Sequence, residues 1–413
     1  MSETSSWLDE LKLRASYGGL GNNSVGNYSW QSTYASKDVY NKNAGIPTWF
    51  TGHNNYTWGN QLVTGMAVTA LANSAITWET TYVTNVGVDF NMFRGRLSGT
   101  LEGFYKDTKN ILISLPAPLV HGASTVPTSN AAEVSNKGLE VTLGWKNSKG
   151  AFNYSIDGNF SYVKNNVEKY KGSEYSVSND GIIMEGLPIG AWYMYKYDRV
   201  LQTDVDMQIV SDMLAYRPDA FDGIGMVPKR GDILYKDVNG DGRLDSDDRT
   251  VVSLYNSPRY LFGLTLGLGW KGLDMQVLVQ GMAGYKTFYS GYMINQPVLA
   301  AGIQVNKTVA EGAWREGVVN AKYPRLTDNN YGLNTIHSDF YLYDNSFVKI
   351  RNIQFGYTLP EKWTNKAAME KVRFYVTLEN FFTFTSFMGF DPEVSGLNYP
   401  TTKQTVLGVN ITL

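Results

Sequence analysis

The residues best suited to chemistry form one acidic run in the middle of the chain. Segment 237–248 reads Asp-Val-Asn-Gly-Asp-Gly-Arg-Leu-Asp-Ser-Asp-Asp. This spacing follows the twelve-residue calcium loop, in which oxygens at positions 1, 3, 5, 7, 9 and 12 converge on one cation and a glycine at position 6 makes the turn. We therefore predict a Ca²⁺ site whose ligands are Asp237, Asn239, Asp241, Arg243, Asp245 and Asp248.

Three of the predicted ligands would bind less directly than the side-chain oxygens of Asp237, Asn239 and Asp241. Arg243 offers only its backbone carbonyl, and Asp245 reaches the ion through a water molecule. Asp248 stands where glutamate is usual, and its shorter side chain reaches less easily for bidentate binding. The alternative is a polar turn that holds no ion. If an ion binds, we expect it to order the loop rather than to take part in catalysis.

Aromatic residues crowd the segment 18–59 and form a second candidate site. Their flat faces are suited to stacking on sugar rings or on peptide side chains. The candidates for ligand contact are Trp30, Tyr34, Trp49 and Trp58. The alternative is that these side chains pack the loop itself and its contact with a second protein.

The chain shows no clear catalytic constellation. It has no cysteine, which excludes disulfides, thiolate catalysis and cysteine metal sites. Asp391 and Glu393 could pair for glycoside hydrolysis, but carboxylates near the start of a loop more often serve as turn or hydrogen-bonding residues. We therefore expect that the protein is not an enzyme.

The elements that position these segments are long β-strands. In 262–270 every second residue is large and apolar, and the residues between are glycine or threonine. A strand that crosses a bilayer needs about nine to eleven residues, whereas most strands have about five or six. Ten stretches alternate in this way, within 11–17, 77–90, 96–106, 139–145, 152–162, 260–270, 273–285, 344–359, 373–379 and 407–413.

Nine of these stretches carry no Lys, Arg, Asp or Glu on the apolar face. A charge there would cost about 2–4 kcal/mol for Arg or Lys at the bilayer midplane. In the tenth stretch, 344–359, the apolar phase changes, and we predict a β-bulge near Arg351–Asn352 that restores one apolar face. The bulge would also turn Lys349 and Arg351 inward. A soluble β-sandwich would exclude charge from its core as well, so alternation leaves that alternative open.

The connections between the ten strands alternate between short and long. Short ones lie at 92–95, 147–150 and 271–272, with a medium one at 360–371. The long ones are 18–76, 108–136, 164–259, 286–343 and 382–403. Outer-membrane barrels have short periplasmic turns and longer external loops. We therefore predict an all-β fold, part of an antiparallel transmembrane β-barrel with long extracellular loops, in which the acidic run lies outside the cell.

The composition of the 413 residues agrees with this fold. A net charge of −2 gives no basic face for nucleic acid, and the 14% of aromatic residues suits the girdles of a barrel. No run of about 18 apolar residues exists, so we expect no transmembrane helix. The first residues lack the features of a signal peptide. We expect the chain to be the C-terminal part of a longer protein.

Several segments, taken in order, resemble one family. They are 11–18 (Leu-Lys-Leu-Arg-Ala-Ser-Tyr-Gly), 76–81 (Ile-Thr-Trp-Glu-Thr-Thr), 136–140 (Asn-Lys-Gly-Leu-Glu), 186–190 (Gly-Leu-Pro-Ile-Gly), 231–242, 348–353 (Val-Lys-Ile-Arg-Asn-Ile) and 389–393 (Gly-Phe-Asp-Pro-Glu). No single segment is decisive. Their ordered run over nearly the whole chain is similar to the SusC/RagA group of TonB-dependent outer-membrane transporters.

The resemblance implies a barrel of about 22 strands around an N-terminal plug. Residues 1–413 would supply the C-terminal strands, with the plug and the TonB box outside this sequence. It also implies an outer-membrane location and import of glycans or peptides, with a SusD-like surface lipoprotein as the lid, TonB as the energy-coupling partner and membrane lipid around the wall. The competing function is that of a secreted or surface-attached glycan-binding β-sandwich without transport.

Overall fold

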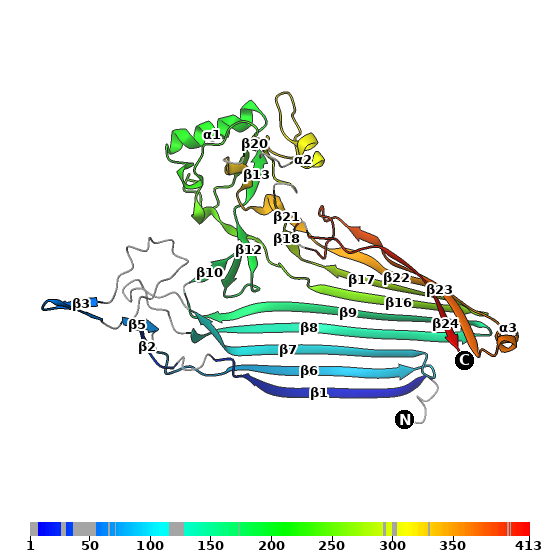
Figure 1. Ribbon diagram of the computed structural model, residues 1–413. Helices are drawn as coiled ribbons and strands as arrows, with labels where there is room; N and C mark the ends of the chain where they lie inside the picture. The colour runs from blue at the N-terminus through cyan, green and yellow to red at the C-terminus, as the bar shows by residue number, and fades with distance from the viewer. Residues whose placement is uncertain are drawn as a thin grey trace.

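The protein is built on one curved antiparallel sheet of ten strands (Figure 1). The computed structural model describes residues 7–25, 30–35, 55–64, 67–70, 72–114, 128–172, 174–291, 295–299, 304–328, 331–394, 396 and 398–413. The strands of the sheet, in spatial order, are β1 (Leu8–Asn22), β6 (Glu79–Met92), β7 (Leu97–Ser114), β8 (Thr128–Lys149), β9 (Phe152–Tyr170), β16 (Tyr260–Trp270), β17 (Leu273–Ala283), β22 (Phe347–Thr358), β23 (Lys371–Thr385) and β24 (Gln404–Thr412). Spatial order follows chain order, so every pairing joins consecutive long strands.

Short turns join the strands at one end of the sheet. Lys271 and Gly272 both have positive φ, 48° and 87°, as a two-residue type I′ hairpin turn requires. The turn between β6 and β7 uses three left-handed residues, Phe93, Arg94 and Gly95, with φ of 58°, 61° and 71°. The medium connection contains a short helix, α3 (Glu361–Thr364). The predicted short and medium connections are therefore confirmed.

The register of the sheet gathers the apolar side chains on one face. Leu264 pairs with Val279, which pairs with Ile350 on the next strand. Leu143 and Phe355, both on interior strands, are 43% and 47% exposed, and no described element covers this face. The hydrophobic core clusters of the described residues lie elsewhere, in the long connections. A soluble sandwich would bury this face under a second sheet, so the sandwich alternative is wrong.

The predicted bulge is present in β22. Leu278 faces Asn352, whereas the next residue of β17, Val279, faces Ile350, so Arg351 is the extra residue. Lys349 then pairs with Gln280 on the inner face, and Arg351 donates a hydrogen bond to Gln280 Oε1 at 2.9 Å. Both cations therefore point inward, as predicted, and the apolar face continues without interruption.

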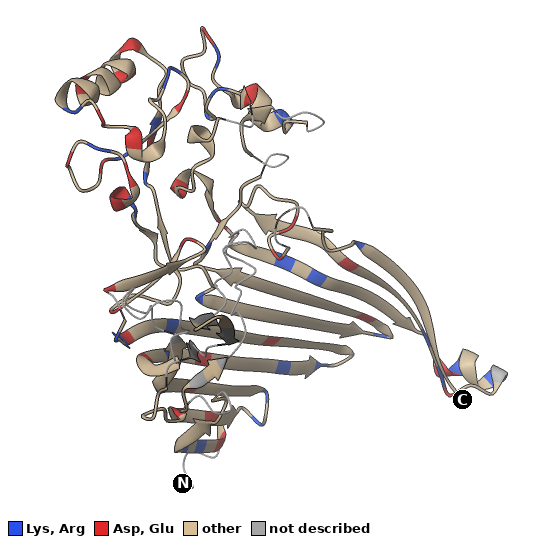
Figure 2. Ribbon diagram, turned by 60° about the vertical axis from the view of Figure 1, so that its left-hand side comes forward, with Lys and Arg blue, Asp and Glu red and all other residues tan. Residues whose placement is uncertain are grey.

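The inner face of the sheet is polar and carries ion pairs. Arg14 lies 3.2 Å from Asp89 on the neighbouring strand and 2.5 Å from Glu102 one strand further on. Arg373 Nε donates to Asp274 Oδ1 at 3.0 Å, across β22. Figure 2 shows that the strands are mostly free of charge and that the long connections above them are rich in it. The two faces of the wall therefore differ in polarity.

Two long connections fold together at the other end of the sheet (Figure 1). We call the described residues 174–257 and 285–346 the external subdomain. Its elements are β10 (Tyr175–Ser178), β11 (Gly181–Met184), β12 (Ala191–Met194), β13 (Tyr197–Val200), α1 (Asp204–Tyr216), β14 (Ile233–Tyr235), β15 (Thr250–Ser253), β18 (Lys286–Phe288), β19 (Val298–Leu299), α2 (Lys307–Gly312), β20 (Thr327–Asp328) and β21 (Leu342–Asp344), with short 3-10 turns between them. This co-folding of two loops was not predicted.

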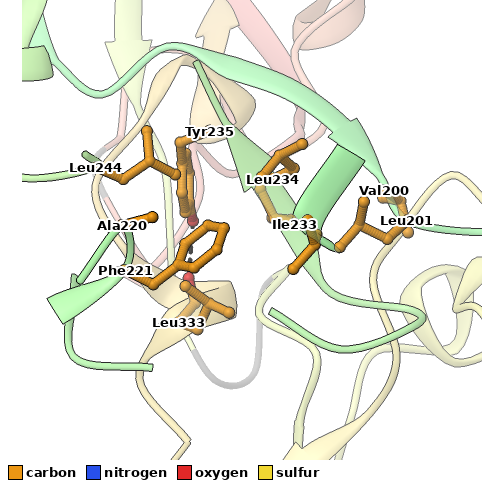
Figure 3. Close-up of a cluster of buried hydrophobic side chains, with 10 residues drawn as sticks. Val200, Leu201, Ala220, Phe221, Ile233, Leu234, Tyr235, Leu244 and Leu333 are labelled. Carbon is orange, nitrogen blue, oxygen red and sulfur yellow. Dashed lines mark hydrogen bonds between the residues drawn. The ribbon is translucent and has the colours of Figure 1, made fainter. Parts of the chain in front are cut away.

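A hydrophobic core joins the two halves of the external subdomain. Figure 3 shows Phe221 and the hydroxyl end of Tyr235 from the first connection next to Leu333 of the second, with Leu244 at the other end of Tyr235. Tyr235 is 2% exposed, and its hydroxyl donates to the Leu333 carbonyl at 2.8 Å. Burying these side chains against one another supplies stability that neither connection has alone.

The connection between β1 and β6 is described only in part. Its short strands are β2 (Thr33–Ala35), β3 (Asn55–Trp58), β4 (Gln61–Thr64) and β5 (Ala67–Ala70), paired β2 with β5 and β3 with β4. Among the described helices, none has the length and apolar character needed to cross a membrane.

Candidate functional site

The acidic run lies in the external subdomain, between β14 and β15, and two buried residues anchor it. Leu244 is fully buried in the subdomain core, and its N–H donates to the Ala220 carbonyl at 2.7 Å. Asp248 is also fully buried, at the end of the 3-10 turn Ser246–Asp248. The loop is therefore held at its apolar position 8 and at its last position, while the residues between are more exposed.

Asp248 closes the loop on itself. Its Oδ1 accepts the Val238 N–H at 2.7 Å, and its Oδ2 accepts the Asp245 N–H at 3.0 Å. Burial raises the pKa of Asp248, and these backbone hydrogen bonds oppose the rise by favouring the ionised form. A buried carboxylate at position 12 thus links the two ends of the run.

The first half of the loop is wound tightly around its own side chains. Asp237 accepts N–H groups from Gly240 at 2.6 Å and from Gly242 at 2.8 Å, and both glycines are left-handed, with φ of 75° and 80°. Asn239 accepts from the Asp241 N–H at 3.0 Å. Each of these oxygens keeps a further lone pair, since a carboxylate offers about four acceptor sites.

The oxygen donors of the loop suit a hard cation, but two arginines lie close to the same carboxylates. Carboxylate, amide and carbonyl oxygens are the ligands that Ca²⁺ prefers. Arg217 lies 3.5 Å from the Asp241 carboxylate, and Arg243 lies 3.4 Å from that of Asp245. Within the described residues, no three acidic, His or Cys side chains lie close enough to hold a metal ion. The calcium site therefore remains a prediction.

The candidate aromatic residues lie on the surface of the connection between β1 and β6. Trp30, Tyr34 and Trp58 are 54%, 61% and 81% exposed, so their faces are open to contact. Trp49 lies outside the described residues. The structure leaves the role of these four in ligand contact as a prediction.

A buried charge cluster at the external end of the sheet was not predicted from the sequence. Lys349 is 1% exposed, and its Nζ donates to Asp391 and to Glu393, each at 2.6 Å. Arg351 also contacts the Glu393 carboxylate. Burial acts to raise the pKa of Asp391, but hydrogen bonds from Lys349 and Thr401 outweigh it and hold the pKa at about 2.

This cluster gives Asp391 and Glu393 a structural role. Both carboxylates bind the Lys349 ammonium, which ties the connection between β23 and β24 to the inner face of β22. The alternation in 344–359 indicated that Lys349 points inward. Its partners lie about 40 residues further along the chain, and no local pattern links them to it.

A second buried carboxylate joins the two halves of the external subdomain. Asp232 is fully buried and accepts from Arg325 Nε at 2.6 Å, from Asn334 Nδ2 at 3.0 Å and from the Tyr331 hydroxyl. Burial raises the pKa of Tyr331 to about 12, so its hydroxyl keeps the proton that it donates. Asp232 comes from the first connection and its three partners from the second.

A curved sheet with an uncovered apolar outer face, an ion-paired inner face and large loops folded at one end is the wall of a transmembrane β-barrel. Residues 4–381 match the family described as TonB dependent receptor-like, beta-barrel, and the chain belongs to that family. The localisation predicted above, in the outer membrane, is confirmed with it.

Curated relatives place the chain near the SusC/RagA group, as the ordered motifs predicted. TonB-dependent receptor P3 of Formosa agariphila is 28% identical over 95% of this chain and 37% of its own length. TonB-dependent receptor SusC of Bacteroides thetaiotaomicron is 23% identical over 98% of this chain and 38% of its own length. The chain thus spans less than half the length of the curated relatives that it matches.

Solved structures agree in fold. The RagAB peptide importer in the 'open-open' state has a TM-score of 0.72 and 22% identity, with all of this chain and 41% of that chain covered. The RagAB peptide transporter has a TM-score of 0.70 and 21% identity, with coverage of 98% and 41%. The ten strands therefore correspond to part of a larger barrel.

Proposed function

We propose that these ten strands are part of the wall of a TonB-dependent importer of glycans or peptides. The observation that carries the proposal is the opposite polarity of the two faces of the sheet, with an exposed apolar outside and an ion-paired inside. Such a wall separates lipid from a polar lumen. The shared fold with a peptide importer supports peptides as cargo, and glycans are included because the ordered motifs resemble the SusC/RagA group.

We place a surface lipoprotein over the external mouth and TonB on the periplasmic side. The external subdomain supports the first of these partners, because two connections with a shared core form a fixed platform above the sheet. TonB would act through the part of the protein that lies outside this sequence. In this arrangement the ten strands are the static part of the transporter, and movement belongs to the lid and the plug.

Uptake by intact cells tests this function. Deleting the gene for the full-length protein should abolish growth on at least one oligosaccharide or oligopeptide offered as the sole nutrient, and a plasmid copy should restore it. Growth on the corresponding monosaccharide or amino acids is the control, since porins admit these. Unchanged growth on every member of a broad panel would contradict the proposal.

We also propose that segment 237–248 binds one Ca²⁺ ion that orders the external subdomain. The proposal rests on the oxygen donor set and on the glycine-permitted turn at Gly242. Asp237→Ala should loosen the connection 164–259 without unfolding the barrel. Limited proteolysis with and without a chelator measures this, and Asp212→Ala on the exposed face of α1 is the matched control. If neither chelation nor Asp237→Ala changes the cleavage, the loop is a turn without an ion.

A further inference from the structure

Two lysines face each other on the outer, apolar face of the sheet, at the external end of its apolar residues. Lys137 of β8 pairs directly with Lys164 of β9, on the same face as Leu139 and Tyr162 in the adjacent outward pair. Both lysines are exposed. Like charges that lie directly opposite each other on neighbouring strands are destabilising. In the described part of the chain, neither lysine forms an ion pair with a carboxylate.

The nearby carboxylates already have other partners. Asp107 lies 3.3 Å from Lys109, and Glu168 accepts from the Ser135 hydroxyl at 2.5 Å. Lys137 acts on Glu168 only through longer-range electrostatics. The facing lysines therefore have unsatisfied positive charge on the lipid-facing side of the wall.

Arg259 adds a third cation at the same level, at the start of β16. Its carbonyl accepts the Val163 N–H at 3.0 Å, so its backbone lies opposite Val163, the residue before Lys164. Its guanidinium lies 4.1 Å from the ring centroid of Tyr255 and donates to the Tyr162 hydroxyl at 2.9 Å. Its Nε is buried and makes no hydrogen bond in the structure. The guanidinium therefore does not use all of its hydrogen-bond donors within the protein.

An apolar groove lies directly below the two lysines. It has a volume of about 490 Å³ and is lined by Lys137, Lys164 and Tyr105 at its upper end and by Val86, Gly103 and Leu139 further down the wall. Tyr105 pairs with Lys137, and Tyr162, which pairs with Leu139 and with Tyr260, lies one outward position below Lys164, so three aromatic residues surround the lysine pair. Aromatic residues gathered in this way mark the membrane interface of a barrel.

We propose that Lys137, Lys164 and Arg259 bind the phosphorylated headgroup of a lipid of the outer leaflet, with an acyl chain of that lipid in the groove below. A phosphate oxygen is a strong acceptor for ammonium and guanidinium donors, and it removes the repulsion between the paired lysines. Basic positions at the lipid-facing boundary of a membrane protein are suited to anionic headgroups. The occupant is a lipid rather than a free anion because the cations continue into an apolar groove on the face that meets the bilayer. The inference rests on the proposed placement of the wall in the membrane.

Lipid binding by the full-length protein in nanodiscs tests the inference. Lipopolysaccharide from the producing bacterium is compared with the same material after enzymatic removal of its phosphates. We expect the phosphorylated form to bind the wild-type protein on the order of a hundredfold more tightly, about fivefold for each of the three cations. Equal affinity for the two forms would overturn the inference. If inorganic phosphate alone bound at the same residues, the site would be one for a free anion, and the inference would be overturned as well.

Variants locate the site on the wall. Lys137→Gln with Lys164→Gln should remove the preference for phosphorylated lipid, and Lys137→Arg with Lys164→Arg should keep it. Lys146→Gln with Lys149→Gln, at the opposite end of β8, is the matched control and should also keep it. A preference unchanged in the glutamine double variant would overturn the inference. Failure of the wild-type protein to enter nanodiscs would instead contradict the proposed membrane function.

Discussion

Lys349 is the residue that ties the last external connection to the sheet. Removing a buried charge leaves its partners uncompensated, which costs about 3–5 kcal/mol. Lys349→Met should therefore free the connection 386–403 and raise its rate of proteolytic cleavage in the full-length protein. Lys403→Met is the control, because Lys403 is exposed and forms no ion pair within the described residues. Equal cleavage in the two variants would contradict the structural role of the cluster.

The same cluster predicts a pH dependence. Asp391 has a pKa of about 2 in the folded protein and an ordinary value of 3.8. A carboxylate with a lowered pKa stabilises the folded state fully above its unfolded pKa, and this contribution is lost as the pH falls towards the folded value. We compare the cleavage of the connection 386–403 by pepsin in the wild-type protein with its cleavage in Lys349→Met. The ratio of wild-type to variant cleavage should rise as the pH falls from about 4 to about 2. A constant ratio over this range would contradict the assignment.

Single residues show what a local pattern can and cannot predict. The inward direction of Lys349 followed from spacing alone, because it depends on residues a few positions apart. The ligand set of the acidic run was inferred in the same way and stays a prediction. The contacts of Lys349 with Asp391 and of Asp232 with Arg325 depend on long-range folding. Neither partner could have been chosen from the sequence, since many other charged residues were equally available.

At the scale of elements, the bulge in β22 decides which side chains meet lipid. Deleting Arg351 removes the extra residue, so Asn352 follows Ile350 directly, and Ile350 stays outward with Lys349 inward in the existing register. We expect the deletion variant to give about the wild-type yield of folded protein in the outer membrane, measured by its heat-modifiable migration in SDS gels. Arg351→Gly keeps the extra residue and should also fold normally. A much lower yield of the deletion variant would contradict the assignment of Arg351 as the extra residue.

The ten strands were predicted in number and order, but several were predicted too short. Alternation placed one strand at 139–145, whereas β8 runs from Thr128 to Lys149. The outer part of β8 contains the buried apolar residues Ala131, Ala132 and Val134, but these do not alternate regularly with polar residues, so the two-residue period is lost. Backbone hydrogen bonds with β7 and β9 continue the strand there without that period. The alternation of apolar and polar residues therefore marks only the lipid-facing part of the strand, whereas backbone hydrogen bonds set its full length.

At the scale of the whole molecule, the sheet has two open edges. β1 pairs only with β6, and β24 pairs only with β23. An unpaired edge in lipid leaves backbone groups unsatisfied, which is strongly unfavourable. We therefore expect residues 1–413 alone to aggregate on size-exclusion chromatography, whereas the full-length protein in detergent elutes as one species. A monodisperse peak of the short chain in detergent-free buffer would contradict a membrane wall.

The core shared by the two halves of the external subdomain limits how the two long connections can change during evolution. Phe221 and Tyr235 pack on Leu333, and Asp232 binds Arg325. Gene exchange that replaced only one of the two connections would bring together surfaces that never coevolved. Recombination should therefore succeed mainly when it moves both connections as one cassette, with the β16–β17 hairpin that lies between them carried along.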